Sequence, residues 1–420
     1  MRRSALISVF LLPWFSVFNP ACAEEDFEWL GFAAFRGGWV EGPPAWIEGG
    51  FGRLREGAGG PGNDDLWARG EAQLGLRWQG LNFSSKIHAL GRIEDSDAEG
   101  RALGLTEAWL GYQRAITDQG ELLARGGLFF YPSSQENIDP LWGSPYTLTY
   151  SAINSWFGEE FRPLGLDVAW RQVLAAGDEW TTAATIFGGN DTLGTLIAWR
   201  GWAMHDRLSV FNERLPLPPV FSLAPEGSFG EQRSFGTTAF GSDLDNRPGY
   251  ALRTRFERPG LANVQLAWVD NRGDRNLHGN EYAWHTRFAI AGGHWQINEQ
   301  FELMAEWNEG RTVMNYPGQP WVKADFRAAY LMGSMHSPFG RWSLRHDRFH
   351  VDDRLGNIGW GLFDDRGQAW TLAWIMDVAN HSRVGLELLW LSSNRIVAGQ
   401  SGFPIDTDGA KLSVEWRLVF

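Results

Sequence analysis

After its first 23 residues the chain has no cysteine and no long apolar run, and it has very little lysine. The only cysteine is Cys22, so the chain beyond it has neither a disulfide nor a thiol for catalysis. No stretch of about twenty apolar residues follows the start, which excludes a transmembrane helix. We also find no strong amphipathic helical pattern, internal repeat or low-complexity linker, so a single domain without a helical layer is expected.

The first 23 residues have the pattern of a secretory signal. Two arginines precede an apolar run, and a small-residue triplet ending at Ala23 supplies a cleavage site. We therefore expect residues 1–23 to be removed as a signal peptide and residues 24–420 to form one barrel domain. A lipid anchor on Cys22 is the alternative, but the preceding Asn19-Pro20-Ala21 is a poor lead-in for one.

Acidic residues outnumber basic ones. The 50 Asp and Glu residues against 37 Lys and Arg residues set the formal net charge at −13, and loss of the two signal arginines would take it to −15. No nucleic-acid partner is therefore expected. Only three of the 37 basic residues are lysines, and the planar guanidinium of arginine suits carboxylate and phosphate groups. A composition bias of the source genome would have the same effect.

Alternation of apolar and polar residues is the most informative pattern present. In residues 410–420, Leu412 and Trp416 share one parity, and Lys411 and Glu415 share the other. Because successive side chains of a strand point to opposite faces, one face is apolar and the other can contact water. The pattern recurs in residues 66–78, 81–89, 250–257, 284–290, 301–308, 324–332 and 384–390. A soluble sheet would also alternate, but the export signal favours a closed barrel in a membrane.

The connections between these segments alternate in length. Short links such as 79–80 and 259–262 separate long loops such as 41–65 and 310–321. Bacterial barrels have short periplasmic turns and longer outer loops in this order. We therefore predict an all-β fold in the bacterial outer membrane: a transmembrane antiparallel β-barrel of about 16 strands, with long extracellular loops of which some fold into the lumen.

Basic residues on the polar face of the strands would face the lumen. The predicted pore-lining residues are Arg69, Arg77, Lys86, Arg125, Arg171, Arg253, Arg255, Arg287, Arg327, Arg345 and Arg383. Arginines on the wall would lower the barrier for small anions. Acidic residues on the same face would also allow pairing across strands, which would make many of these charges structural.

Residues 127–137, GLFFYPSSQEN, follow the fifth expected strand. They resemble the corresponding stretch of the phosphate-selective porin O and P family. The resemblance implies porin architecture and makes residues 131–161 the constriction loop; an ordinary outer loop is the alternative. The solute is not carried over, because residues 131–161 contain no Lys or Arg, whereas that family lines its constriction with basic side chains. The predicted constriction residues are Glu136, Asp139, Glu159, Glu160 and Arg162.

Residues 189–249 form an unusually long connection, and such connections are either functional or disordered. Its apolar part, 196–221, needs cover that the lumen or a neighbouring protomer can provide. We therefore expect this connection to be a long outer loop or a second plug of the lumen.

Two histidine clusters are weighed for catalysis. His346 and Asp347 are neighbours on a strand and so face opposite sides, and the turn with His381 has no oriented acid nearby. His350 and Asp352 are interpreted as solvated loop charges and not as metal ligands. We expect no catalytic residue, no metal and no cofactor.

These patterns together predict a porin through which small polar or anionic solutes diffuse passively. Its partners would be outer-membrane lipid and the solutes, and a homotrimer is one option because related general porins often form trimers. Two other classes stay open: a plugged receptor or specific transporter barrel, and an outer-membrane hydrolase.

Overall fold

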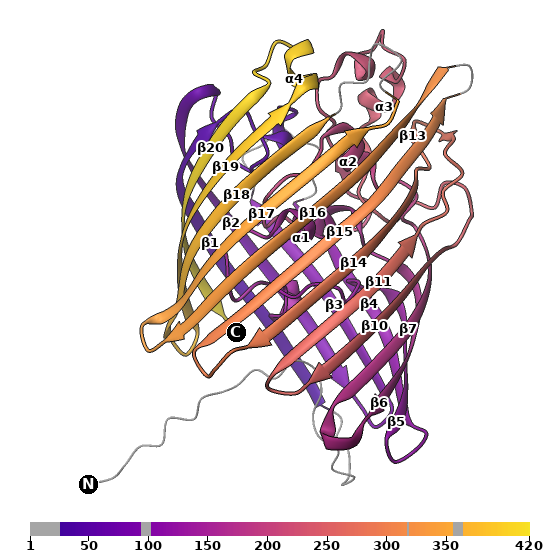
Figure 1. The fold of residues 1–420 in the computed structure, drawn as a ribbon, viewed down its shortest axis with the longest axis vertical. Helices are drawn as coiled ribbons and strands as arrows, with labels where there is room; N and C mark the ends of the chain where they lie inside the picture. Colours follow the sequence, from indigo (N-terminus) through magenta and orange to yellow (C-terminus); the bar gives the residue numbers. More distant parts are fainter. Residues whose placement is uncertain (1–25, 94–101, 317–318, 356–363) are drawn as a thin grey trace.

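The computed structural model describes residues 26–93, 102–316, 319–355 and 364–420, so the predicted signal peptide lies outside the described residues. Sixteen strands form one closed antiparallel barrel (Figure 1), which confirms the predicted fold and strand number. In chain order they are β1 (Asp26–Gly42), β2 (Gly60–Gln79), β3 (Phe83–Ile93), β4 (Leu103–Ala115), β5 (Gly120–Leu128), β6 (Leu164–Val173), β7 (Glu179–Gly188), β10 (Gly249–Arg258), β11 (Ala262–Asp270), β14 (His285–Gln296), β15 (Phe301–Tyr316), β16 (Gln319–Ser337), β17 (Gly340–Asp353), β18 (Asp365–Ala379), β19 (Ser382–Arg395) and β20 (Asp406–Val419). Pairing of β1 with β20 closes the barrel.

Short elements occupy the connections. They are η1 (Trp46–Glu48), η2 (Pro140–Trp142), α1 (Ala152–Glu160), η3 (Ala175–Gly177), α2 (Thr195–Trp199), η4 (Phe221–Leu223), α3 (Gly230–Phe235), α4 (Ile396–Gln400) and the two-residue strands β8 (Arg214–Leu215), β9 (Thr237–Thr238), β12 (Leu277–His278) and β13 (Glu281–Tyr282). Among the described residues, no helix has both the length and the apolar character to cross a membrane.

The turns and loops lie at opposite ends of the barrel. The links 80–82, 259–261 and 338–339 are short, and they lie at the same end as the C-terminus (Figure 1). Short turns mark the periplasmic end of such barrels, so the other end is extracellular. The predicted loop 310–321 is wrong, because β15 and β16 extend through most of it.

The parity of β20 is as predicted. Leu412, Val414 and Trp416 are 38%, 52% and 50% exposed on the outer face, whereas Lys411 and Glu415 are nearly fully buried inside. An exposed apolar face on a closed barrel is the face that lipid covers.

On β14 and β16 the predicted parity is wrong. Phe288 and Phe326 face the interior and are buried, whereas Arg287 and Arg327, both predicted to line the pore, lie exposed on the outer surface. The reason is that the interior is apolar here: the ring of Trp156 in α1 packs edge-on against both phenylalanines, with centroids 5.2 Å apart in each case. An apolar strand face can therefore turn inward wherever an apolar segment fills the lumen.

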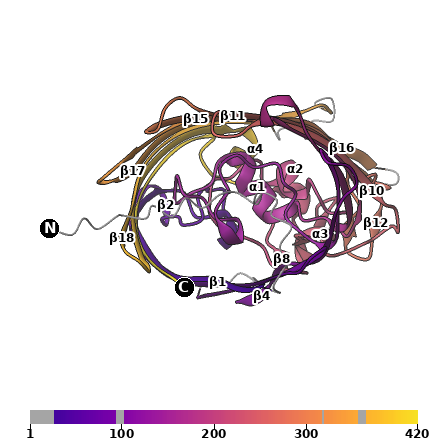
Figure 2. The ribbon, with the colours of Figure 1, turned by 90° about the horizontal axis from the view of Figure 1, so that it is seen from below.

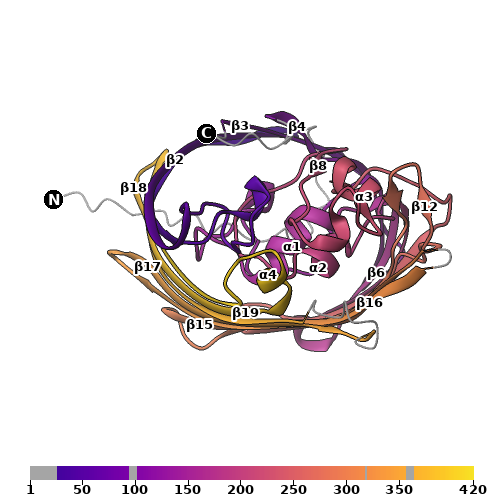
Figure 3. The same cartoon turned by 90° about the horizontal axis from the view of Figure 1, so that it is seen from above.

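Segments of three loops enter the barrel. We call residues 43–58, 129–163 and 190–210 the first, second and third inward segments. Views along the barrel show α1 and α2 inside the ring of strands (Figures 2 and 3). Every residue from 190 to 210 is buried, and so is all of α1. The expectation that some outer loops fold into the lumen is confirmed.

Candidate functional site

The second inward segment is held along the wall formed by β17, β18 and β19. Arg345 of β17 donates hydrogen bonds to Glu136, at 2.8 Å, and to the carbonyl oxygen of Thr149, at 2.9 Å. Glu387 of β19 accepts from the backbone N–H groups of Leu148, at 2.6 Å, and of Thr149, at 3.0 Å. Because buried N–H groups need acceptors, these wall charges fix the path of the segment.

Helix α1 is stabilised by its cap and by its aromatic residues. Ser151 at the N-cap accepts a hydrogen bond from the N–H of Asn154, at 3.2 Å. Phe157 packs edge-on against Phe161, and Phe161 packs in the same way against Phe288 of the wall. Edge-to-face aromatic pairs of this kind add stability beyond their buried area. The helix is therefore part of a continuous core inside the barrel.

The third inward segment docks on the C-terminal end of α1. Arg200 forms a two-pronged ion pair with Glu159, at 2.9 and 2.7 Å, and His205 lies 3.1 Å from the same carboxylate. Burial opposes ionisation of Glu159, but Arg200 and His205 hold its pKa at about 2. Burial raises the pKa of Glu160 to about 7, although it accepts a hydrogen bond from the Leu196 N–H. The two neighbouring carboxylates therefore differ in charge at pH values between these two pKa values, where Glu159 is ionised and Glu160 is mainly protonated.

The sequence pattern predicts only a long outer loop at residues 41–65, whereas residues 43–58 enter the barrel as the first inward segment. Arg53 donates to Asp365 of β18, at 2.9 Å, and to the Trp202 carbonyl of the third segment, at 2.7 Å. Its neighbour Glu56 pairs with Lys411 of the wall. The apolar residues of this segment, such as Phe51 and Leu54, indicate its burial, because a solvent-exposed loop rarely contains several large apolar residues.

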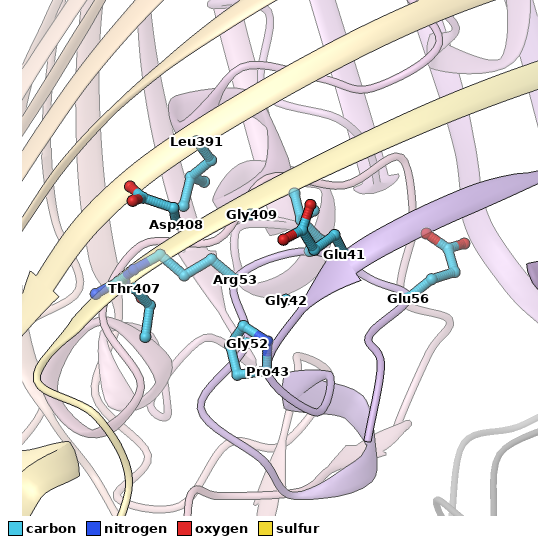
Figure 4. Close-up of a pocket in the computed structure, with 11 residues that line it drawn as sticks. Glu41, Gly42, Pro43, Gly52, Arg53, Glu56, Leu391, Thr407, Asp408 and Gly409 are labelled. Carbon is cyan, nitrogen blue, oxygen red and sulfur yellow. The ribbon is translucent and has the colours of Figure 1, made fainter. Parts of the chain in front are cut away.

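A small opening lies where the first inward segment leaves the wall (Figure 4). It is lined by residues of β1, this segment, β19 and β20. Arg53 lines it, but its guanidinium is bound to Asp365. We assign no ligand to this opening.

Most predicted constriction residues hold the segments together. Glu136, Glu159, Glu160 and Arg162 have 0% exposure, and Asp139 is the member of the set that reaches solvent, with a side chain that is 17% exposed. The guanidinium of Arg162 lies 3.3 Å from the ring centroid of Phe130 and donates to two backbone carbonyls. Of the predicted wall residues, Arg69 and Arg345 are also enclosed by such contacts. These residues therefore contact protein and not solute.

The other predicted wall residues that face the interior lie nearer the periplasmic end and retain contact with solvent. We call them, together with Arg341, which the sequence analysis did not select, the inner-wall basic group: Arg77, Lys86, Arg125, Arg171, Arg253, Arg255, Arg341 and Arg383. Their side chains are 13% to 32% exposed. Each has a carboxylate nearby, so pairing across strands accompanies access to water.

Within this group, two arginines share one aspartate. Asp167 of β6 accepts two hydrogen bonds from Arg253 of β10, at 2.7 and 3.0 Å, and a third from Thr185, at 2.7 Å. Arg125 of β5 lies 3.7 Å from the same carboxylate and stacks on the Phe129 ring, 4.1 Å from its centroid. Because Asp167 is already bound on both oxygens, the site has an excess of positive charge beside the start of the second inward segment.

Three carboxylates, Asp191, Asp243 and Asp245, lie within 4.8 Å of one another near the extracellular end. Asp191 accepts from the N–H of Asp245, at 3.3 Å, and burial raises the pKa of Asp191 to about 6. Asp245 accepts from the Asp274 N–H, at 2.6 Å. These bonds order the loops, and we assign no ion to the cluster.

The histidine clusters do not form a catalytic arrangement in the described residues. His346 faces outward and stacks on Trp370, with centroids 4.2 Å apart, whereas Asp347 faces the interior. His350 lies 2.6 Å from Asp352 on the outer face of β17. His381 contacts a backbone carbonyl in an exposed turn.

Solved outer-membrane channels have a similar fold. The outer membrane channel DcaP of Acinetobacter baumannii matches with a TM-score of 0.58 at 12% identity, over 94% of this chain and 97% of that chain. OmpF of Salmonella typhi, in complex with daunomycin, matches with a TM-score of 0.52 at 12% identity, over 93% of this chain and 97% of that chain. The anion-selective porin from Comamonas acidovorans matches with a TM-score of 0.51 at 11% identity, over 94% of this chain and 100% of that chain. No family model matches the chain, and no curated protein matches its sequence. The chain therefore has the fold of outer-membrane porins.

Proposed function

We propose that this protein is an outer-membrane channel for the passive diffusion of small polar or anionic solutes. The observation that carries the proposal is the shared Asp167 site, where Arg125 has access to water and its nearest carboxylate is bound by Arg253. The neighbouring carboxylate only weakly neutralises such a guanidinium. In a narrow pore this guanidinium therefore lowers the energy of a passing anion more than a guanidinium in a close ion pair does.

The likeness of the fold to a channel and to an anion-selective porin supports this assignment. In this chain the basic groups would come from the wall, since residues 131–161 contain no Lys or Arg. We propose in addition that residues 1–23 direct export, that residues 24–420 form the mature barrel and that three barrels assemble as one homotrimer.

Reversal potentials in a salt gradient across a planar bilayer test the proposal. The wild-type protein is expected to prefer anions, and Arg125→Gln is expected to shift the reversal potential toward that of a non-selective pore. Arg114→Gln is the matched control, because Arg114 is exposed on the outer face of β4 near the periplasmic end. An equal shift in both variants would exclude the Asp167 site as the source of selectivity.

A plugged receptor or specific transporter is the second candidate. It is favoured by the complete burial of residues 190–210 and of α1, which lie inside the ring of strands (Figures 2 and 3). Such a protein would give no spontaneous conductance until a ligand or partner displaced the inward segments. The outer-membrane hydrolase has no comparable support: of the histidines considered for catalysis, His346 stacks on Trp370, His350 contacts Asp352 on the outer face of β17, and His381 contacts a backbone carbonyl.

A further inference from the structure

The outer surface of the barrel carries a row of arginines that the channel function does not use. Arg327 on β16, Arg348 on β17 and Arg366 on β18 are exposed on the outward face. In the strand register Arg327 lies opposite His350, and His350 lies opposite Arg366. Neighbouring strands are about 4.8 Å apart, so Arg327 and Arg366 are separated by about 10 Å across three strands. We call these three residues the outer arginine row.

The outer arginine row lies directly above the apolar band of the barrel. On β16 the outward residue four positions nearer the periplasm is Leu331, and on β17 the corresponding residue is Leu344. On β18 it is Trp370, which is 44% exposed. An outward tryptophan next to an apolar band marks the level at which hydrocarbon gives way to headgroups. The arginines therefore lie at the headgroup level of the outer leaflet.

Most acidic residues on this outer face contact side chains that are not part of the outer arginine row. Asp325 accepts from Arg311, at 2.9 Å, and from Arg354, at 2.7 Å. Asp352 lies 2.6 Å from His350. Glu309 is opposite Arg327 in the register, but among the described residues no ion pair joins them.

We propose that the outer arginine row binds the phosphate groups of outer-leaflet lipid headgroups. Three things point to this occupant: the positive charge, the position at the border of the apolar band, and the absence of an ion-pair partner for these arginines in the described part of the chain. The planar guanidinium forms two parallel hydrogen bonds to a phosphate, and a row spanning three strands contacts phosphates about 10 Å apart. The barrel wall thereby fixes the headgroup of a bound lipid at one site.

The experiment measures binding of diphosphorylated lipid A to the purified, detergent-solubilised full chain by native mass spectrometry. The double variant Arg327→Gln/Arg366→Gln is expected to bind at least about tenfold more weakly, which corresponds to about 1.4 kcal/mol. Arg247→Gln is the matched control, since Arg247 is an exposed arginine in an extracellular loop away from the row. The control is expected to bind as the wild type does.

Other outcomes overturn the proposal. Equal binding by the wild type and the double variant excludes the row as a lipid site. Full displacement of lipid A by inorganic phosphate assigns the row to a soluble anion. A change in oligomeric mass without a change in lipid binding assigns it to contact between two copies of the chain. If the double variant does not fold, Arg348→Gln supplies the same comparison at a neighbouring position of the row.

Discussion

Arg345 of the wall donates a hydrogen bond to Glu136 of the second inward segment, at 2.8 Å, and neither side chain is exposed. Arg345 also donates to Asp347 beside it on β17, at 2.7 Å. The pair joins residues 209 positions apart in the sequence and attaches the inward segment to the barrel. Charges that the sequence places on a pore wall are here part of the packed interior.

Replacing one partner of this pair is expected to destabilise the protein. Arg345→Met leaves the carboxylates of Glu136 and Asp347 buried without their cation, which costs about 3–5 kcal/mol. Urea unfolding in lipid vesicles measures the loss. Arg345→Met combined with Glu136→Gln is the control, and it should recover part of the stability because one of the two uncompensated charges is gone. No loss in the single variant would contradict the observed contact.

Trp156 is expected to keep α1 in place. It is 1% exposed and packs against Phe288, Phe326 and Trp202. Trp156→Ala removes these contacts and costs about 3–5 kcal/mol. If the second inward segment narrows the lumen, single-channel conductance should also rise in this variant. Trp416→Ala, on the exposed outer face, is the control and should leave conductance unchanged.

Docking of the third inward segment on α1 is expected to weaken as pH rises. Burial raises the pKa of Glu160 from 4.5 to about 7, so the folded state holds this proton more tightly than the unfolded state does. The stabilisation is therefore complete below pH 4.5 and is lost as pH rises to about 7. Hydrogen exchange of residues 194–201, corrected for the intrinsic effect of pH, should increase across this window. Glu160→Gln should remove the change, and an unaltered pH dependence in that variant would exclude Glu160 as its cause.

The outward face of β20 supplies a test of the membrane orientation. Leu412 is 38% exposed on that face, so Leu412→Arg places a charge toward hydrocarbon and costs about 2–4 kcal/mol if it is near the midplane. Unfolding in lipid vesicles measures this cost. Leu412→Ile, which keeps the face apolar, should have little effect. A neutral result for Leu412→Arg would place this strand face outside the bilayer.

The sequence predicts the barrel well because alternation and loop length are local patterns. In β20, where Lys411 faces the interior and Leu412 faces outward, parity alone gives the correct orientation. On β14 and β16 the same argument fails, since alternation separates two faces but does not say which one meets lipid. That choice depends on Trp156, which lies over a hundred residues away in the chain and makes the interior apolar.

The inner wall was predictable only in part for a related reason. Arg125 and Arg253 could be placed on the inward face from parity, and both lie on the inner wall with access to water. Whether an inward arginine contacts water or a loop depends on contacts between distant segments, as for Arg345 with Glu136. The position of Arg53 against Asp365 depends on the fold of a loop rich in glycine and proline, which has no periodicity to read.

Recording the current carried by the purified wild-type protein in a planar bilayer tests the central claim most directly. We expect stepwise conductance in the absence of any ligand, with a reversal potential in a salt gradient whose sign shows preference for anions. A bilayer that contains the inserted protein and shows no conductance would contradict the assignment as a diffusion channel and would identify the barrel as plugged.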